Sequence, residues 1–400
     1  MRTSSRHKAR LGRSISATLG LLLVGVAATP AHAESVRSMQ WHLDAMHADE
    51  MWKTSTGEGV TVAVIDSGVD PDLPALRGQV LEGRDFSPEA GTYADDAEGH
   101  GTGIAAVIAG TGMGAGAYGL APGTKILPIR LWKENGEQTG KDHERTLAAA
   151  IRYAADSSAK VINMSIGGPK QSDIVTEAVQ YALDKGALLF AATGNTGTSV
   201  VEYPAAVPGV VGVGSVDKQV NRAPESATGP EVDLVAPGVD IVSACNKDSS
   251  LYCRSHGTSD ATALASASAA LIWSKYPEWT NNQVLRVMLN TAGGPRSGNK
   301  RNDSIGYGVV RPRIALKSPG NPGPAGEYPL PDLAAAASPS PSPEDSKPAA
   351  GSQGDNQQSA AAAPSSDDES NAGLWIALGV GAALLIGAAV AIPVARARRG

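Results

Sequence analysis

VTVAVIDSGVD, residues 60–70, is the stretch of the chain that decides the fold class. Its first six residues form an unbroken run rich in β-branched side chains, which is typical of a strand buried on both faces of a parallel sheet. Asp66 ends this run, and the glycine at position 68 permits a tight turn directly after it. We therefore expect a buried parallel strand with a carboxylate at its carboxyl end.

Outward from this stretch, strand and helix patterns alternate along the chain. Further strands are predicted at residues 126–131, 161–164, 187–192 and 210–213. Helices are predicted at residues 101–109, 145–157, 174–185 and 258–276. The alternation predicts an α/β fold with a doubly wound, mostly parallel sheet and helices on both faces. In such folds the functional site lies beyond the carboxyl ends of the strands.

Both ends of the chain carry the patterns of targeting segments. Residues 1–33 combine a basic start, an apolar run and a small-residue cleavage pattern, which predicts a signal peptide; an uncleaved anchor helix is the alternative. Residues 373–395 are uncharged and long enough to cross a bilayer, which predicts a transmembrane helix rather than a buried core helix. The basic tail, residues 396–400, marks the cytoplasmic side.

Between these ends we expect one folded domain and a linker. Residues 317–372 are rich in Pro, Ala and Ser and are predicted to be disordered, since they contain too few apolar residues to build a core. Residues 34–316 are long enough for one large domain. The expected protein is single-pass and lies in the cell membrane, with this domain outside the cell and the C-terminus in the cytoplasm.

Charge and cysteine content exclude some classes of function. The formal net charge is -6, with no basic block outside the termini, which argues against nucleic acid as a partner. Cys245 and Cys253 are the two cysteines, and in an exported chain so close a pair favours a local disulfide over two free thiols. Their spacing does not make a zinc site. No cofactor is expected.

Three short motifs place reactive side chains at the predicted site. Asp66 ends its strand, His100 opens a helix within GHGTG (residues 99–103), and Ser259 opens the long helix within GTS (residues 257–259). Each alone has an ordinary explanation: a capping carboxylate, a structural histidine, a serine N-cap. Their order along the chain makes them a candidate set for nucleophilic catalysis.

These motifs resemble those of the subtilisin-like serine proteases, and the resemblance covers residues 41–316. It implies a catalytic triad in which Ser259 attacks the peptide carbonyl, His100 transfers the proton and Asp66 orients the imidazole. It also implies that Asn195, in the segment AATGN, donates to the oxyanion; a simple turn asparagine is the alternative.

The same resemblance implies how an extended peptide or secreted protein substrate would bind. The segment NMSIGGP, residues 163–169, resembles the strand that pairs with substrate backbone. The predicted substrate-binding residues are Ser165, Ile166, Gly167 and Gly168. Residues 136–140 are expected to form the opposite edge.

The chain also departs from the family pattern. Asp260 follows Ser259 directly, where the family has Met or Phe, and the usual proline after it is absent. The carboxylate either raises the pKa of His100, or it points to solvent or caps the helix N-terminus. Residues 110–119 are mostly Gly and Ala and lack the oxygens of a calcium loop, so no metal is predicted. No foldable pro-domain is expected before the Asp66 strand.

The overall layout resembles that of the mycosins, membrane-anchored proteases associated with type VII secretion. This resemblance implies hydrolysis of peptide bonds in secreted proteins, with membrane subunits of a secretion channel as partners. Two alternatives stay open. One is a general cell-surface protease, and the other is a catalytically weak scaffold that stabilises a membrane complex.

Overall fold

A computed structural model describes residues 35–337, apart from residues 115, 132–140 and 246–251. The predicted signal peptide, transmembrane helix and basic tail lie outside these residues, as does the segment 136–140. Within the described part of the chain, no helix is both long and apolar enough to cross a bilayer.

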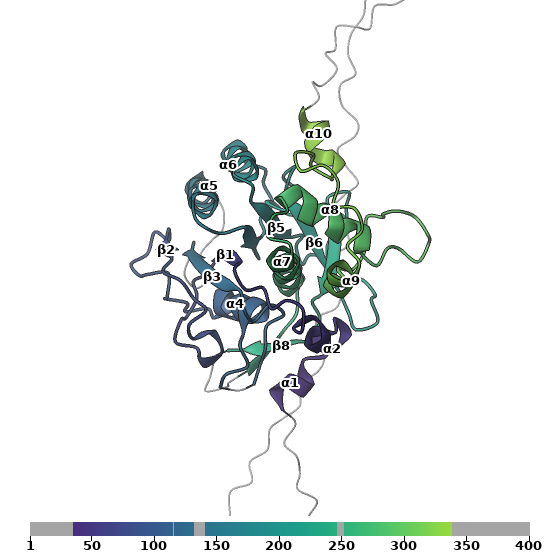
Figure 1. The fold of residues 1–400 in the computed structure, drawn as a ribbon. Helices are drawn as coiled ribbons and strands as arrows, with labels where there is room; N and C mark the ends of the chain where they lie inside the picture. Colours follow the sequence, from purple (N-terminus) through teal and green to yellow (C-terminus); the bar gives the residue numbers. More distant parts are fainter. Residues whose placement is uncertain (1–34, 115, 132–140, 246–251, 338–400) are drawn as a thin grey trace, which may run out of the picture. The chain divides into compact units, whose positions relative to one another are not determined.

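A seven-stranded parallel sheet forms the centre of the domain, as the alternating pattern predicts (Figure 1). Its order is β2 (Arg84–Asp85), β3 (Lys125–Arg130), β1 (Thr61–Asp66), β4 (Val161–Met164), β5 (Leu188–Ala192), β6 (Val211–Val216) and β7 (Leu234–Pro237). Val62 of β1 pairs with Ile126 on one side and Val161 on the other. Strands β4 to β7 are buried throughout, which explains why their sequences are continuous rather than alternating.

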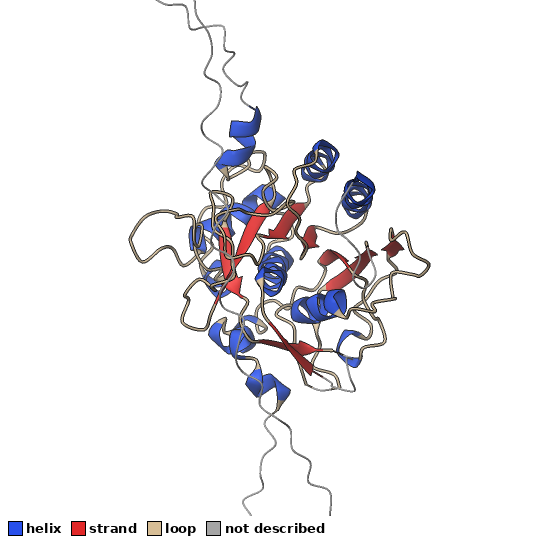
Figure 2. Ribbon diagram, turned by 180° about the vertical axis from the view of Figure 1, so that it is seen from behind, coloured by secondary structure: helices blue, strands red, loops and turns tan. Residues whose placement is uncertain are grey.

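Helices cover both faces of the sheet (Figures 1 and 2). Helices α5 (Lys141–Asp156) and α6 (Asp173–Asp184) pack on one face, in an apolar cluster with Ile65 and Met164. Helices α4 (His100–Ala109), α7 (Thr258–Lys275) and α8 (Asn281–Thr291) pack on the other. Helix α7 is buried almost all round, and its many alanines and serines allow it to lie close to the strands.

The winding of the chain places a topological switch point at the carboxyl edge of the sheet. Strand β1 lies between β3 and β4, and the connections through α4 and α5 run over opposite faces. The chain thus changes winding direction between β1 and β4, where α/β folds place their ligands. Asp66 ends β1 and Ser165 follows β4, so both lie at this edge.

Several short elements complete the domain. They are α1 (Val36–Met39), α2 (Trp41–Ala45), α3 (Ala48–Met51), the 3-10 turn η1 (Pro74–Leu76), and a hairpin of β8 (Ile241–Ala244) and β9 (Tyr252–Ser255). Cys245 and Cys253 form a disulfide at this hairpin, with an S–S distance of 1.98 Å.

The folded domain continues past residue 316, so the predicted linker boundary is too early. Helix α9 (Pro312–Lys317) is followed by an ordered path to α10 (Pro331–Ala337). Leu330 is 3% exposed, and the Tyr328 hydroxyl donates a 2.9 Å hydrogen bond to the Gly209 carbonyl. Arg286 of α8 donates to carbonyls along the same segment. The average composition of residues 317–372 does not reveal these contacts, because a few buried side chains are enough to hold a Pro-rich segment against the domain.

Candidate active site

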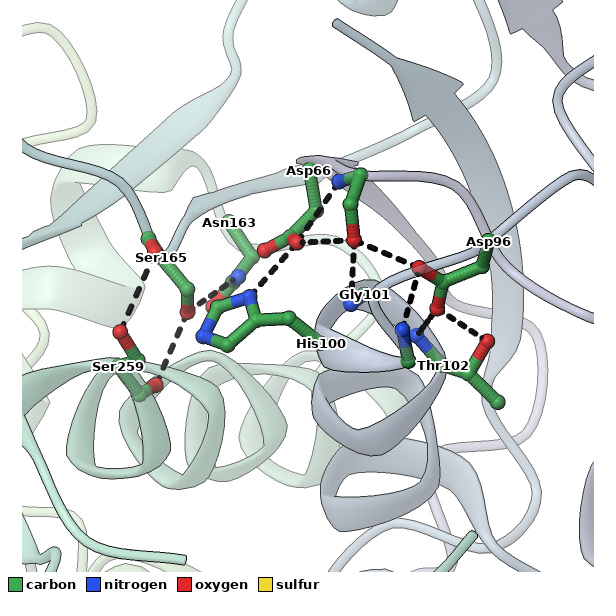
Figure 3. A network of polar contacts seen from close by, with 10 residues as sticks. Asp66, Asp96, His100, Gly101, Thr102, Asn163, Ser165 and Ser259 are labelled. Atoms are coloured by element: carbon green, nitrogen blue, oxygen red, sulfur yellow. Dashed lines mark hydrogen bonds and ion pairs between the residues drawn. The ribbon is translucent and has the colours of Figure 1, made fainter. Parts of the chain in front are cut away.

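The Asp66 carboxylate and the His100 imidazole are joined by a short hydrogen bond. His100 Nδ1 lies 2.7 Å from Asp66 Oδ1 (Figure 3). Asp66 is fully buried, whereas the His100 side chain is 37% exposed. Ser67 N also donates to Oδ1, at 2.8 Å. In the neutral imidazole, a buried carboxylate on Nδ1 selects the tautomer with its proton on that nitrogen, so that Nε2 carries the basic lone pair.

Asp96 holds the start of α4, on which His100 lies. Its carboxylate accepts hydrogen bonds from Gly99 N at 2.9 Å and from Thr102 N at 2.8 Å. It also accepts from the hydroxyls of Ser67 and Thr102. These bonds connect the loop after β1 to the first turn of α4. Sequence reasoning missed Asp96, although an acid shortly before a helix is a capping signal.

Ser259 lies in the first turn of α7, beside the segment that follows β4. Its hydroxyl donates to the Ser165 carbonyl at 3.2 Å, and its own carbonyl accepts from Ser165 Oγ at 2.9 Å (Figure 3). Asn163 donates to Ser165 Oγ and accepts from Ser266 of α7. These bonds link β4 to α7, and Asn163 too was missed by sequence reasoning. The Ser259 hydroxyl is not hydrogen-bonded to His100 in this structure.

Asn195 follows β5 and lies next to the start of α7. Its Oδ1 accepts from Thr258 N at 2.9 Å and from Thr258 Oγ1 at 3.0 Å. A backbone N–H must face an oxygen, so this contact identifies which amide atom is Oδ1. The Nδ2 group therefore remains available as a donor beside Ser259.

Residues 165–168 follow β4, contact Ser259 at one end and pair with Tyr203 at the other. Gly168 and Tyr203 exchange two backbone hydrogen bonds of 2.8 Å. An apolar hollow borders the segment, with Leu147, Ile166 and Val175 among its lining residues. The segment thus contacts Ser259, pairs with the loop at Tyr203 and borders an apolar wall.

Comparison with known proteins agrees with this geometry. Residues 57–308 match the subtilase family. The chain belongs to this family. It is 38% identical to Subtilisin E from Bacillus subtilis (strain 168) over 241 residues, which are 59% of the chain and 61% of that relative. The chain thus spans about six-tenths of the length of this curated relative.

Solved subtilases share the fold of the domain. The crystal structure of MycP1 from Mycobacterium smegmatis has a TM-score of 0.60 at 28% identity, covering 71% of this chain and 86% of that one. The MycP3 protease from the type VII (ESX-3) secretion system has a TM-score of 0.61 at 32% identity, covering 69% and 87%. Both are mycosins, the group that the layout of the sequence resembles.

Asp260 contributes to the electrostatics of this site. Burial lowers the pKa of His100, but the charge of Asp66 and its hydrogen bond outweigh this effect, and Asp260 and Glu98 add to it, so that the pKa is raised to about 9. Burial also raises the pKa of Asp260 itself, to about 6, although Ser255 Oγ donates to it at 2.8 Å. Asp260 is only 4% exposed. It is therefore buried rather than in solvent, with Ser255 of β9 as a hydrogen-bond partner and His100 close enough for the two charges to interact.

Proposed function

We propose that the chain is a serine endopeptidase that hydrolyses peptide bonds of extracellular or secreted proteins. Asp66, His100 and Ser259 are the proposed triad, and Asn195 is the proposed oxyanion donor. The observation that carries the proposal is the 2.7 Å bond from the buried Asp66 carboxylate to His100 Nδ1, at the edge where α7 presents Ser259. This arrangement supplies a base, its orienting group and a nucleophile.

In the proposed reaction, the Ser259 hydroxyl turns from the Ser165 carbonyl toward His100 Nε2. Nε2 takes the hydroxyl proton while Oγ bonds to the substrate carbonyl carbon, and the carbonyl oxygen becomes an oxyanion. Asn195 Nδ2 and the Ser259 N–H donate to that oxyanion. His100 then gives its proton to the leaving amine. Water, activated by the same imidazole, releases the acyl group and restores Ser259.

The substrate is proposed to bind as an extended strand along residues 165–168. Backbone pairing with these residues would place a scissile carbonyl between Ser259 Oγ and Asn195 Nδ2. Main-chain hydrogen bonds give such binding its affinity, and side-chain pockets give it selectivity.

A fluorophosphonate probe tests the proposal, because it reacts only with an activated serine hydroxyl. We expect labelling of the full chain at pH 9, its loss in Ser259→Ala, and its retention in Ser274→Ala. Ser274 lies at the other end of α7 and donates to the Glu58 carbonyl, so the second variant controls for the same substitution in the same helix. Labelling that persists in Ser259→Ala would disprove the role of Ser259. Labelling that is absent at every pH would favour the scaffold.

The cellular setting is proposed from the sequence layout together with the MycP3 likeness. The expected C-terminal membrane anchor would hold the domain outside the cell, beside a type VII secretion channel. Co-purification of the full chain with channel subunits, lost when residues 373–395 are replaced by an unrelated span, would support this setting. Cleavage without any such association would favour a general cell-surface protease.

A further inference from the structure

Glu202 places a carboxylate between the two segments that border Ser259. A Cβ atom at Gly167 would lie 2.0 Å from Glu202 Oε2, and one at Gly194 would lie 2.7 Å from Glu202 Cδ. Gly167 belongs to the proposed peptide-binding strand, and Gly194 directly precedes Asn195. The carboxylate therefore occupies the space between strand and oxyanion donor, and glycines at both positions leave room for it.

The backbone around Glu202 is held on two sides. Glu202 N donates to the Thr193 carbonyl at 3.0 Å, at the end of β5. The next residue, Tyr203, forms the paired bonds with Gly168 described above. These bonds connect Glu202 to both segments at once. The carboxylate is thus part of the wall of the site and not a loose surface group.

Within the described residues, the structure offers this carboxylate no positive partner. Glu202 is half-buried, and burial raises its pKa with no opposing contribution from a cation or a hydrogen bond. No described side chain forms an ion pair with it or donates to it. A partly desolvated carboxylate without such partners gains most from a cation that arrives with a ligand.

We propose that Glu202 selects substrates with arginine or lysine immediately before the scissile bond. The inference rests on the proposed function. When the scissile carbonyl lies between Ser259 Oγ and Asn195 Nδ2, the side chain before it enters the space between residues 165–168 and 193–195, where Glu202 lies. A guanidinium can bond both carboxylate oxygens, whereas an ammonium acts as a point charge, so arginine is favoured over lysine.

Two matched sets of probes test the proposal on the full chain. The first is a series of quenched-fluorescence peptides that differ only in the residue before the scissile bond: arginine, lysine, glutamine, leucine or glutamate. The second is a pair of peptidyl phosphonates with an arginine-like or a leucine-like group there. We expect arginine and lysine to exceed glutamine in kcat/KM, or in labelling rate, by about 10- to 100-fold.

The variants separate selectivity from catalysis. Glu202→Gln should lose this preference, with the arginine and lysine rates falling to the level of the glutamine rate, and Glu202→Arg should favour glutamate. Glu177→Gln, an exposed change on α6, should leave the preference intact. Equal rates for cationic and neutral probes in the wild type would overturn the role of Glu202 and leave the protease standing. Failure of every phosphonate and fluorophosphonate to label would instead overturn the proposed function.

Discussion

The side-chain oxygen of Asn195 accepts a 2.9 Å hydrogen bond from Thr258 N, the residue before the proposed nucleophile. This bond joins the end of β5 to the start of α7 and leaves Asn195 Nδ2 to donate. It is the donor, not the oxygen, that the proposed reaction uses.

Asn195→Ala should therefore lower kcat by about 10²- to 10³-fold, because the oxyanion loses a donor in the transition state. KM should change little, since the bond forms only as charge develops. Steady-state kinetics on one cleaved peptide measure both constants. Asn302→Ala is a control for the same substitution elsewhere in the chain. The Asn302 side chain accepts hydrogen bonds from the backbone N–H groups of residues 304 and 305 in a loop. A loss expressed mainly in KM would contradict the assignment.

The acid limb of the pH–rate profile, where kcat/KM falls at low pH, should reflect the protonation of His100. The base must be neutral, so kcat/KM should rise with pH through an apparent pKa of about 9. Asp260, whose pKa is about 6, is ionised over that range and stabilises the protonated imidazole. Asp260→Asn removes this charge and should move the limb to lower pH, raising kcat/KM at pH 7 several-fold. Asp66 and Glu98 still act in the variant, so the limb should stay above the ordinary pKa of histidine. Superimposable profiles would refute the coupling.

The segment after α9 should contribute to the stability of the domain. Leu330→Ala should lower the free energy of unfolding by about 2–4 kcal/mol, because it leaves a cavity at a 3% exposed position. Val200→Ala, at a 66% exposed side chain, should change it by less than about 0.5 kcal/mol. Denaturant unfolding compares the two. Equal, small effects would show that residues beyond 317 are dispensable.

The disulfide should stabilise the β8–β9 hairpin and thus the domain. Replacing both Cys245 and Cys253 by serine should cost about 2–3 kcal/mol, the chain entropy of so short a loop. Unfolding of the wild type in the presence of a reductant should reproduce the loss, and the same reductant should not affect the double variant. An unchanged midpoint in the reduced wild type would argue against a structural role.

Sequence patterns predicted the long, regular elements well. The strands ending at Asp66 and Met164 and the helices opened by His100 and Thr258 were expected within a few residues, because buried parallel strands and long helices have strong local signatures. The short helices α1 to α3 and the two-residue strand β2 have too few residues for such a signature. The ordered path to α10 was missed for another reason: its anchors, Tyr328 and Leu330, act through contacts far away in the chain.

The sequence alone determined the family, the order of the three reactive residues and the candidate oxyanion donor, because these depend on short motifs at strand and helix ends. Only the tertiary structure decided what surrounds them. Asp260 is buried against Ser255 and does not lie in solvent, and the Glu202 carboxylate lies between Gly167 and Gly194. Neither position has a local pattern, since Asp260 contacts the β8–β9 hairpin and Glu202 lies between the loops after β4 and β5. These tertiary contacts determine which charged groups lie near His100 and near the proposed peptide-binding strand.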